Sequence, residues 1–150
     1  MGTVYGYFRS KEALLDEVLR QRTAAAVGTY LAGIAGITNS VDRIMAALTI
    51  FASFVQANQP ILLALFQIST GRGLELDDAP ARWLLVALRE MLLAGIEAGE
   101  IRELPVDATA RAIIGLHLMG ILGVAIFRER AGDESLPAEL REIVRMLLER

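Results

Sequence analysis

The amino-acid sequence predicts an all-α fold. Apolar residues recur at helical spacing, glycine, asparagine and proline separate the apolar segments, and the alternating pattern typical of strands is nearly absent. With 150 residues, the chain has the size of one domain, or of one domain with a small attachment. A chain of this size buries roughly 70% of its extended-chain surface, so it can be stable without disulfides. We therefore expect a helical bundle with its own core.

The first half of the chain predicts three helices. Ser10 is a suitable N-cap for a helix that fades at Gly33, because its hydroxyl can accept from the free N–H groups of the next turn. Ser40 is expected to cap the second helix, which ends before Pro60, and Pro60 suits the first turn of a short helix that reaches Thr70. The apolar stripe of the second helix consists of Val41, Ile44, Met45, Leu48, Ala52 and Val55.

The second half predicts three more helices. One opens at Asp77 and extends to Gly99, the next runs from about Asp107 to Arg130, and the last begins near Pro137. The inward stripe of the first of these three consists of Leu84, Leu85, Leu88, Met91, Leu92 and Gly95.

The composition disfavours several classes of site. There is no cysteine, which removes disulfides and thiolate metal sites and fits a reducing cytoplasm. The presence of a single histidine, His117, disfavours a histidine-based metal centre and a Ser-His-Asp triad. The net charge of -3 argues against a globally basic nucleic-acid binder, although a local patch can still contact DNA. We therefore expect no metal and no cofactor.

The apolar content of 54% suggests a second buried surface, such as a dimer interface. The most apolar segment, residues 112–127, is too short for a usual membrane span and carries His117, so we expect no membrane insertion. No secretory signal is visible, and we expect a cytoplasmic protein.

The opening stretch GTVYGYFRSKEALL, residues 2–15, has three aromatic residues followed by a cationic link and a helix start. It resembles the recognition helix and following helix start of TetR-family transcriptional regulators, in which a Gly/Thr-hydrophobic-Tyr-x-x-Phe turn precedes a Ser-Lys-Glu-x-Leu cap. Residues 97–120 resemble the family's connection between its last ligand-domain helices. The resemblance implies a TetR-like helical bundle, with residues 1–30 a remnant of the helix-turn-helix domain and its connecting helix. Residues 31–150 would then form the ligand-binding and dimerisation domain.

Four residues of this stretch have side chains suited to DNA. Thr3, Tyr5 and Tyr7 carry hydroxyls on short or rigid side chains, and these suit phosphate and base-edge contacts. Lys11 lies at a helix N-terminus, where its ammonium and the free backbone N–H groups can meet one phosphate. The alternative is that the aromatic residues pack on a neighbouring helix and that Lys11 is solvated.

The family places two helices before this stretch, and the given sequence has neither. A recognition helix needs the preceding helix as its support. We therefore expect either a fragment or mis-started reading frame, or a natural remnant that no longer binds operator DNA. The sequence leaves both open.

Large, adaptable apolar residues on the middle helices suggest a small apolar effector, because methionine and aromatic walls accommodate varied ligands. His117 would supply one polar anchor. These residues could equally fill a core, and His117 could be a satisfied core histidine. The candidate ligand-binding residues are Met45, Phe51, Phe54, Phe66, Trp83, Leu88, Met91 and His117.

Small residues on the fifth expected helix permit close helix approach, and the last helix carries an apolar stripe. The resemblance implies that these two helices form half of an antiparallel four-helix interface in a homodimer. The candidate interface residues are Ala112, Gly115, Met119, Gly123, Leu140, Ile143, Val144 and Leu147.

Three functions fit the sequence to different degrees. The leading hypothesis is a TetR-like, ligand-responsive regulator, expected to be a repressor, whose partners are itself, a small apolar effector and, where the missing helices are present, operator DNA. The alternative is a stand-alone dimeric ligand-binding module, or a dominant-negative partner of intact relatives, without DNA binding. A small helical enzyme is disfavoured because no catalytic constellation is present; the carboxylates of Asp77 and Asp78 more simply start a helix.

Overall fold

The computed structural model describes residues 10–68, 82–126 and 136–149, and within these ranges it contains six helices and no strand. The predicted all-α fold is confirmed. The helices are α1 (Lys11–Ile34), α2 (Ser40–Ala57), α3 (Gln59–Ile68), α4 (Arg82–Glu97), α5 (Val106–Ile126) and α6 (Leu136–Leu148). α1 ends at Ile34, so it runs without a break across residue 30, where the sequence analysis placed the boundary between the two expected domains.

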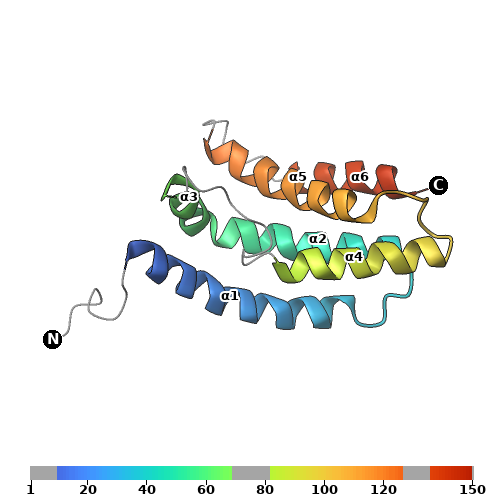
Figure 1. Cartoon of the computed structure of the whole chain (residues 1–150), viewed down its shortest axis with the longest axis horizontal. Helices are drawn as coiled ribbons and strands as arrows, with labels where there is room; N and C mark the ends of the chain where they lie inside the picture. Colours follow the sequence, from blue (N-terminus) through green and yellow to red (C-terminus); the bar gives the residue numbers. More distant parts are fainter. Residues whose placement is uncertain (1–9, 69–81, 127–135, 150) are drawn as a thin grey trace.

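The central helix of the bundle is α2, which packs against α1, α3, α4, α5 and α6. α1 runs along one side of the molecule, α2 and α4 form the middle, and α5 and α6 pair on the opposite side (Figure 1). α3 lies at the end where α1 begins and packs against α1. The core therefore lies around α2, with α1 and the α5–α6 pair on its two sides.

The two apolar stripes predicted for α2 and α4 both face this core. Every residue of each stripe is buried, and Phe51 extends the buried face of α2. α4 approaches its neighbours most closely at Gly95, where a Cβ would lie 2.5 Å from Ile101 Cδ1 and 2.8 Å from Ser40 Cβ. A glycine at this point of α4 is therefore a packing requirement.

Helix capping agrees with the sequence at α1 and differs at α2. Ser10 Oγ accepts a hydrogen bond of 3.1 Å from the Ala13 amide, as expected of an N-cap. At α2 the cap is Asn39, whose Oδ1 accepts from the Asp42 amide at 3.1 Å, and Ser40 is the first helical residue. The predicted cap at Ser40 was wrong by one position, because the asparagine side chain reaches the same free amides.

A carboxylate from another part of the chain also stabilises the start of α2. α4 ends at a glycine turn, in which Gly99 has φ +71° and the Glu100 amide donates to the Gly95 carbonyl at 2.8 Å. This turn places Glu100 Oε2 2.7 Å from the Ser40 amide, one of the free N–H groups of α2. The connection between α4 and α5 is thereby tied to the N-terminus of α2.

We expect this contact to make stability fall in acid. The hydrogen bonds from Ser40 lower the pKa of Glu100 below its ordinary value of 4.5. A carboxyl group whose pKa is lower in the folded state stabilises the fold above its unfolded pKa, and this contribution is lost as the pH falls through the folded value. In Glu100→Gln, the melting temperature should be lower than in the wild type at pH 7, and the two should converge as the pH falls through the lowered pKa of Glu100. A difference that does not change with pH would contradict this account.

Gly95→Ala is expected to destabilise the fold by about 1–3 kcal/mol, because the added methyl must displace Ile101 and the backbone-proximal Cβ of Ser40. Gly28 is the matched control: it lies on the exposed side of α1 with no atom within 4 Å of an added Cβ. Gly28→Ala should stabilise the fold by about 0.5–1 kcal/mol through helix propensity. Urea unfolding of both variants measures the difference, and equal midpoints would contradict the close packing of Gly95.

Among the described residues, α2 and the segment Val106–Gly123 of α5 are long and apolar enough to cross a membrane by length and composition. Half of the first segment and a third of the second are buried inside the protein.

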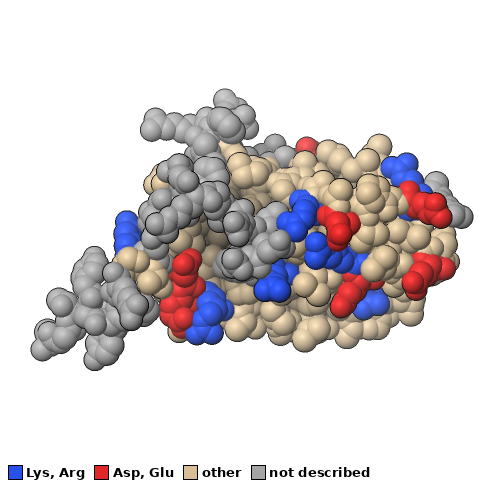
Figure 2. All heavy atoms as spheres, viewed as in Figure 1, with Lys and Arg blue, Asp and Glu red and all other residues tan. Residues whose placement is uncertain are grey.

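Charged side chains of both signs are interspersed on the face formed by α1 and α4 (Figure 2). That face therefore carries no broad basic area among the residues described.

Candidate functional site

The residues predicted to bind a ligand gather in the core around α2. Met45, Phe51, Leu88 and Met91 are buried in one cluster contributed by α2 and α4. Phe54 and Trp83 are half-buried and pack against this cluster, whereas the side chain of Phe66 lies outside what the structure describes. The structure thus brings together side chains that lie on different helices in the sequence.

His117 is fully buried on α5, with 0% of its surface exposed. Its Nδ1 lies 3.0 Å from the carbonyl oxygen of Ile113, and because a carbonyl only accepts, Nδ1–H is the donor. Burial lowers the pKa of His117, and the positive charge of Arg141 lowers it further, against the opposing hydrogen bond to Ile113. The neutral ring therefore leaves Nε2 as a bare acceptor, and this atom has no hydrogen-bond partner among the described residues.

An aromatic pair joins α1 to α4. The rings of Tyr30 and Trp83 lie 5.1 Å apart between centroids and are tilted by 58°. Such tilted pairs add about 0.5–1.5 kcal/mol beyond the area that they bury. Burial raises the pKa of Tyr30, with Arg43 of α2 opposing the increase. Trp83 therefore reports on the position of α1 relative to the core.

A polar contact joins α1 to the junction of α2 and α3. Arg22 Nη1 donates to Oδ1 of the buried Asn58 at 2.8 Å. Asn58 Nδ2 in turn donates to the Phe54 carbonyl at 2.7 Å, and the Asn58 carbonyl accepts from the Ile61 amide at 3.0 Å. α1 is thus connected to the point at which α2 ends and α3 begins. The sequence offered no signal for this contact, because its two partners are 36 residues apart.

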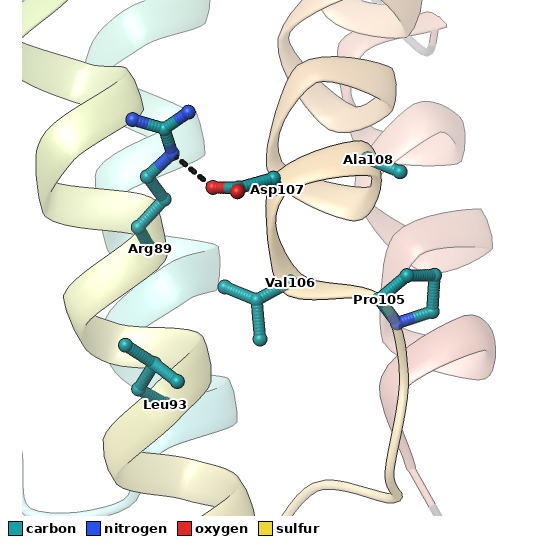
Figure 3. Close-up of a pocket in the computed structure, with 6 residues that line it drawn as sticks. All are labelled: Arg89, Leu93, Pro105, Val106, Asp107 and Ala108. Carbon is teal, nitrogen blue, oxygen red and sulfur yellow. Dashed lines mark ion pairs between the residues drawn. The ribbon is translucent and has the colours of Figure 1, made fainter.

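A surface pocket of about 450 Å³ lies where the second half of α4 faces the start of α5. Arg89 and Leu93 of α4 form one wall, and residues 105–108 form the other (Figure 3). Arg89 Nε pairs with Asp107 Oδ1 at 2.7 Å across the pocket, and Val106 points into the space between the two helices. None of these residues was among those predicted to bind a ligand. The sequence indicated Asp107 only as the start of a helix.

The predicted dimer residues divide into two groups. On the outer surface of α5 and α6, Met119, Ile143 and Leu147 have 44%, 46% and 50% of their surface exposed. Ala112 is also exposed and Gly115 has open space around it. We call this surface the α5–α6 face; its apolar members are Ala112, Leu116, Met119, Ile143, Met146 and Leu147.

The other predicted dimer residues lie inside the protomer. Leu140, Val144 and Gly123 are buried, and Leu140 packs on Gly120, where an added Cβ would lie 2.7 Å from Leu140 Cδ1. Of the four α6 residues predicted at the dimer interface, Leu140 and Val144 are thus buried in the protomer, whereas Ile143 and Leu147 are exposed on its surface. The four positions span one arc of roughly 100° on the helix surface, and the half of this arc that carries Leu140 and Val144 contacts the protomer's own α5 and α2.

The predicted DNA contacts Thr3, Tyr5 and Tyr7 lie outside the described residues. Lys11 is the first residue of α1 and is exposed. Among the described residues, no group of three or more histidine, cysteine or acidic side chains is placed to hold a metal ion.

The sequence matches no protein-family model and no curated protein. Its fold, however, closely matches solved transcriptional regulators. FadR from Bacillus subtilis in complex with stearoyl-CoA aligns with a TM-score of 0.76 and 20% identity, over 97% of this chain and 81% of that one. The TetR-family regulator PfmR from Thermus thermophilus aligns with a TM-score of 0.70 and 20% identity, over 97% and 79%. The fatty acid degradation regulator FadR from Bacillus halodurans aligns with a TM-score of 0.67 and 18% identity, over 99% and 79%. The chain therefore has the fold of TetR-type regulators.

Proposed function

We propose that this protein is a ligand-responsive transcriptional regulator of the TetR type that acts as a homodimer and represses transcription. The observation that carries the proposal is the shared fold, which aligns 97% of this chain with FadR bound to stearoyl-CoA. Regulation of DNA binding requires the complete helix-turn-helix, so operator DNA is a partner where the two helices that precede the recognition helix are present. Thr3, Tyr5, Tyr7 and Lys11 are the proposed DNA contacts, and the cytoplasm is the proposed location.

The proposed effector has a mainly apolar body. Support comes from the core around α2, in which two methionines and a phenylalanine, Met45, Met91 and Phe51, are packed beside the partly buried Phe54 and Trp83. Thioether side chains repack at low cost, so such a core can open around a ligand. An acyl chain has the required chemistry, and stearoyl-CoA occupies the structurally similar FadR.

Two contacts offer a route from the ligand to α1. A ligand that displaces the end of α2 would move Asn58, which holds Arg22 of α1. The same displacement would change the packing of Trp83 against Tyr30. Because α1 follows directly after the recognition stretch, its position sets the spacing of the two recognition stretches in a dimer. The effector must bind the released arrangement more tightly than the DNA-bound one, since only differential affinity shifts a population.

Saturable binding of an apolar ligand is the expected result of a thermal-shift screen with fatty acids, fatty alcohols and acyl-CoA esters. A ligand at a hundred times its Kd should stabilise the fold by about 2.7 kcal/mol and raise the melting temperature accordingly. Trp83 fluorescence should follow the same binding curve, because Trp83 is the only tryptophan in the chain. Phe54→Ala should weaken binding, whereas Leu31→Ala, on the exposed side of α1, should leave it unchanged. A screen without any saturable ligand would contradict the proposed function.

A further inference from the structure

The starting observation is that His117 presents one defined hydrogen-bonding atom to the interior. Its Nδ1–H is used by the Ile113 carbonyl at 3.0 Å, so the ring is held in one tautomer and one orientation. The remaining ring nitrogen, Nε2, is buried and has no partner among the described residues. A buried polar atom without a partner is costly, and native proteins seldom leave one unexplained.

The chemistry of Nε2 determines what can satisfy it. In the neutral ring, Nε2 carries a lone pair and no proton, so it accepts a hydrogen bond and cannot donate one. Burial and Arg141 both favour this neutral form. A hydroxyl or amide N–H group can therefore pair with Nε2, whereas a carboxylate or ether oxygen would place one lone pair against another.

The apolar surroundings restrict the rest of such a partner. His117 lies on the inward face of α5, whose neighbouring buried residues include Ile113, Ile114 and Ile121. α5 packs against α2, α4 and α6, so this face belongs to the same core as the proposed ligand-binding residues. A group that reaches Nε2 must be attached to an apolar body, because the core offers little else for it to contact.

We propose that the effector is a neutral amphiphile that donates a hydrogen bond from a hydroxyl or amide group to Nε2 of His117. This inference rests on the proposed ligand-binding function and makes it more specific. It predicts that the site prefers a long-chain alcohol to an ether of the same composition, and also to the corresponding carboxylate. A hydrogen-bond donor in this core replaces an unsatisfied acceptor with a satisfied one, which is worth roughly a tenfold gain in affinity.

The test uses three probes of similar size: undecanol, its isomer decyl methyl ether, and undecanoate. The two isomers have the same atoms, but only the alcohol donates. With the 150-residue chain, titration of Trp83 fluorescence at pH 7 should give an affinity for undecanol about tenfold higher than for decyl methyl ether. Undecanoate should bind more weakly than undecanol.

Two variants form a matched pair. In His117→Asn, the amide nitrogen takes the place of Nδ1 and keeps a donor for Ile113, but the Nε2 acceptor is lost. In His117→Gln, the side-chain carbonyl can take the place of Nε2 and accept. We expect the preference for undecanol over the ether to disappear in His117→Asn and to persist at severalfold in His117→Gln.

A measurement on the wild-type chain does not depend on these variants folding. His117 is the only histidine, so labelling histidine with ¹⁵N gives one ring to observe by NMR. We expect one protonated and one unprotonated nitrogen in the ligand-free protein, and the Nε2 resonance should shift when undecanol is added but not when the ether is added. An Nε2 resonance that both isomers leave unchanged, as a water-bound Nε2 would give, overturns the inference.

The outcomes separate this inference from the proposed function. If the three probes bind with equal affinity, or if undecanoate binds most tightly with both ring nitrogens protonated, the ligand-binding function stands and the role of His117 is wrong. If neither these probes nor the wider screen yields saturable binding, the proposed function fails and the inference fails with it.

Discussion

Leu147→Glu is expected to convert a dimer of this chain into a monomer without unfolding it. Leu147 lies on the α5–α6 face with half of its surface exposed, so a glutamate at this position is solvated in the protomer. In a dimer that buries this face, the same charge would be unpaired in an apolar seam, and such a change costs several kcal/mol of association free energy, roughly 3–5. Sedimentation at micromolar concentration should show the dimer for the wild type and a monomer of 16.3 kDa for the variant.

The control for this experiment is Leu31→Glu. Leu31 matches Leu147 in residue type and in exposure, since 59% of its surface is exposed. It belongs to α1, which lies on the opposite side of the bundle from the α5–α6 pair. It should leave the dimer intact. An obligate interface on the α5–α6 face would bury on the order of 2,000 Å² or more. A wild-type chain that sediments as a monomer, or a Leu31→Glu variant that dissociates while Leu147→Glu does not, would exclude this face as the interface.

The second large effect is expected inside the protomer. Leu140→Ala should cost about 2–5 kcal/mol of the free energy of unfolding, because Leu140 is buried against α5 and packs directly on Gly120. Ile143→Ala, three residues further along the same helix, should change the stability of the protomer by less than about 0.5 kcal/mol, since Ile143 faces outward.

Both substitutions are best measured in the monomeric Leu147→Glu background, because loss of the dimer otherwise contributes to the unfolding free energy. Urea unfolding then compares the inner and outer sides of α6 directly. Equal losses for Leu140→Ala and Ile143→Ala would mean that α6 does not divide its apolar residues between core and surface as the structure indicates.

This division of α6 illustrates what a sequence pattern can and cannot predict. In α2 and α4 the predicted stripes are buried throughout, because each helix has a broad apolar side that only the core can cover. In α6 the four apolar residues follow the same helical spacing, yet Leu140 and Val144 face the protomer while Ile143 and Leu147 face outward. The pattern shows that an arc of about 100° on α6 is apolar, but it does not show which part of this arc contacts the protomer and which part faces outward.

The candidate site shows the same limit. The sequence identified His117 as a unique polar residue among apolar ones, and the structure buries it as expected for either a core residue or a ligand anchor. The state of its ring could not be inferred, because it depends on the hydrogen bond to Ile113 and on the proximity of Arg141 from another helix. The Arg89–Asp107 pair and its pocket were missed for a related reason: neither residue is unusual until α4 and α5 are placed side by side.

The sequence by itself determined the all-α class, the order of the helices, the Ser10 cap and the core stripes of α2 and α4. These features follow from local periodicity and from backbone groups that must be satisfied within a few residues. Only the tertiary structure decided which side of α6 faces outward, how Arg22 reaches Asn58 across 36 residues, and which ring nitrogen of His117 is left bare. Each of these depends on side chains that are distant along the chain and meet only when the helices pack, so no local pattern encodes them.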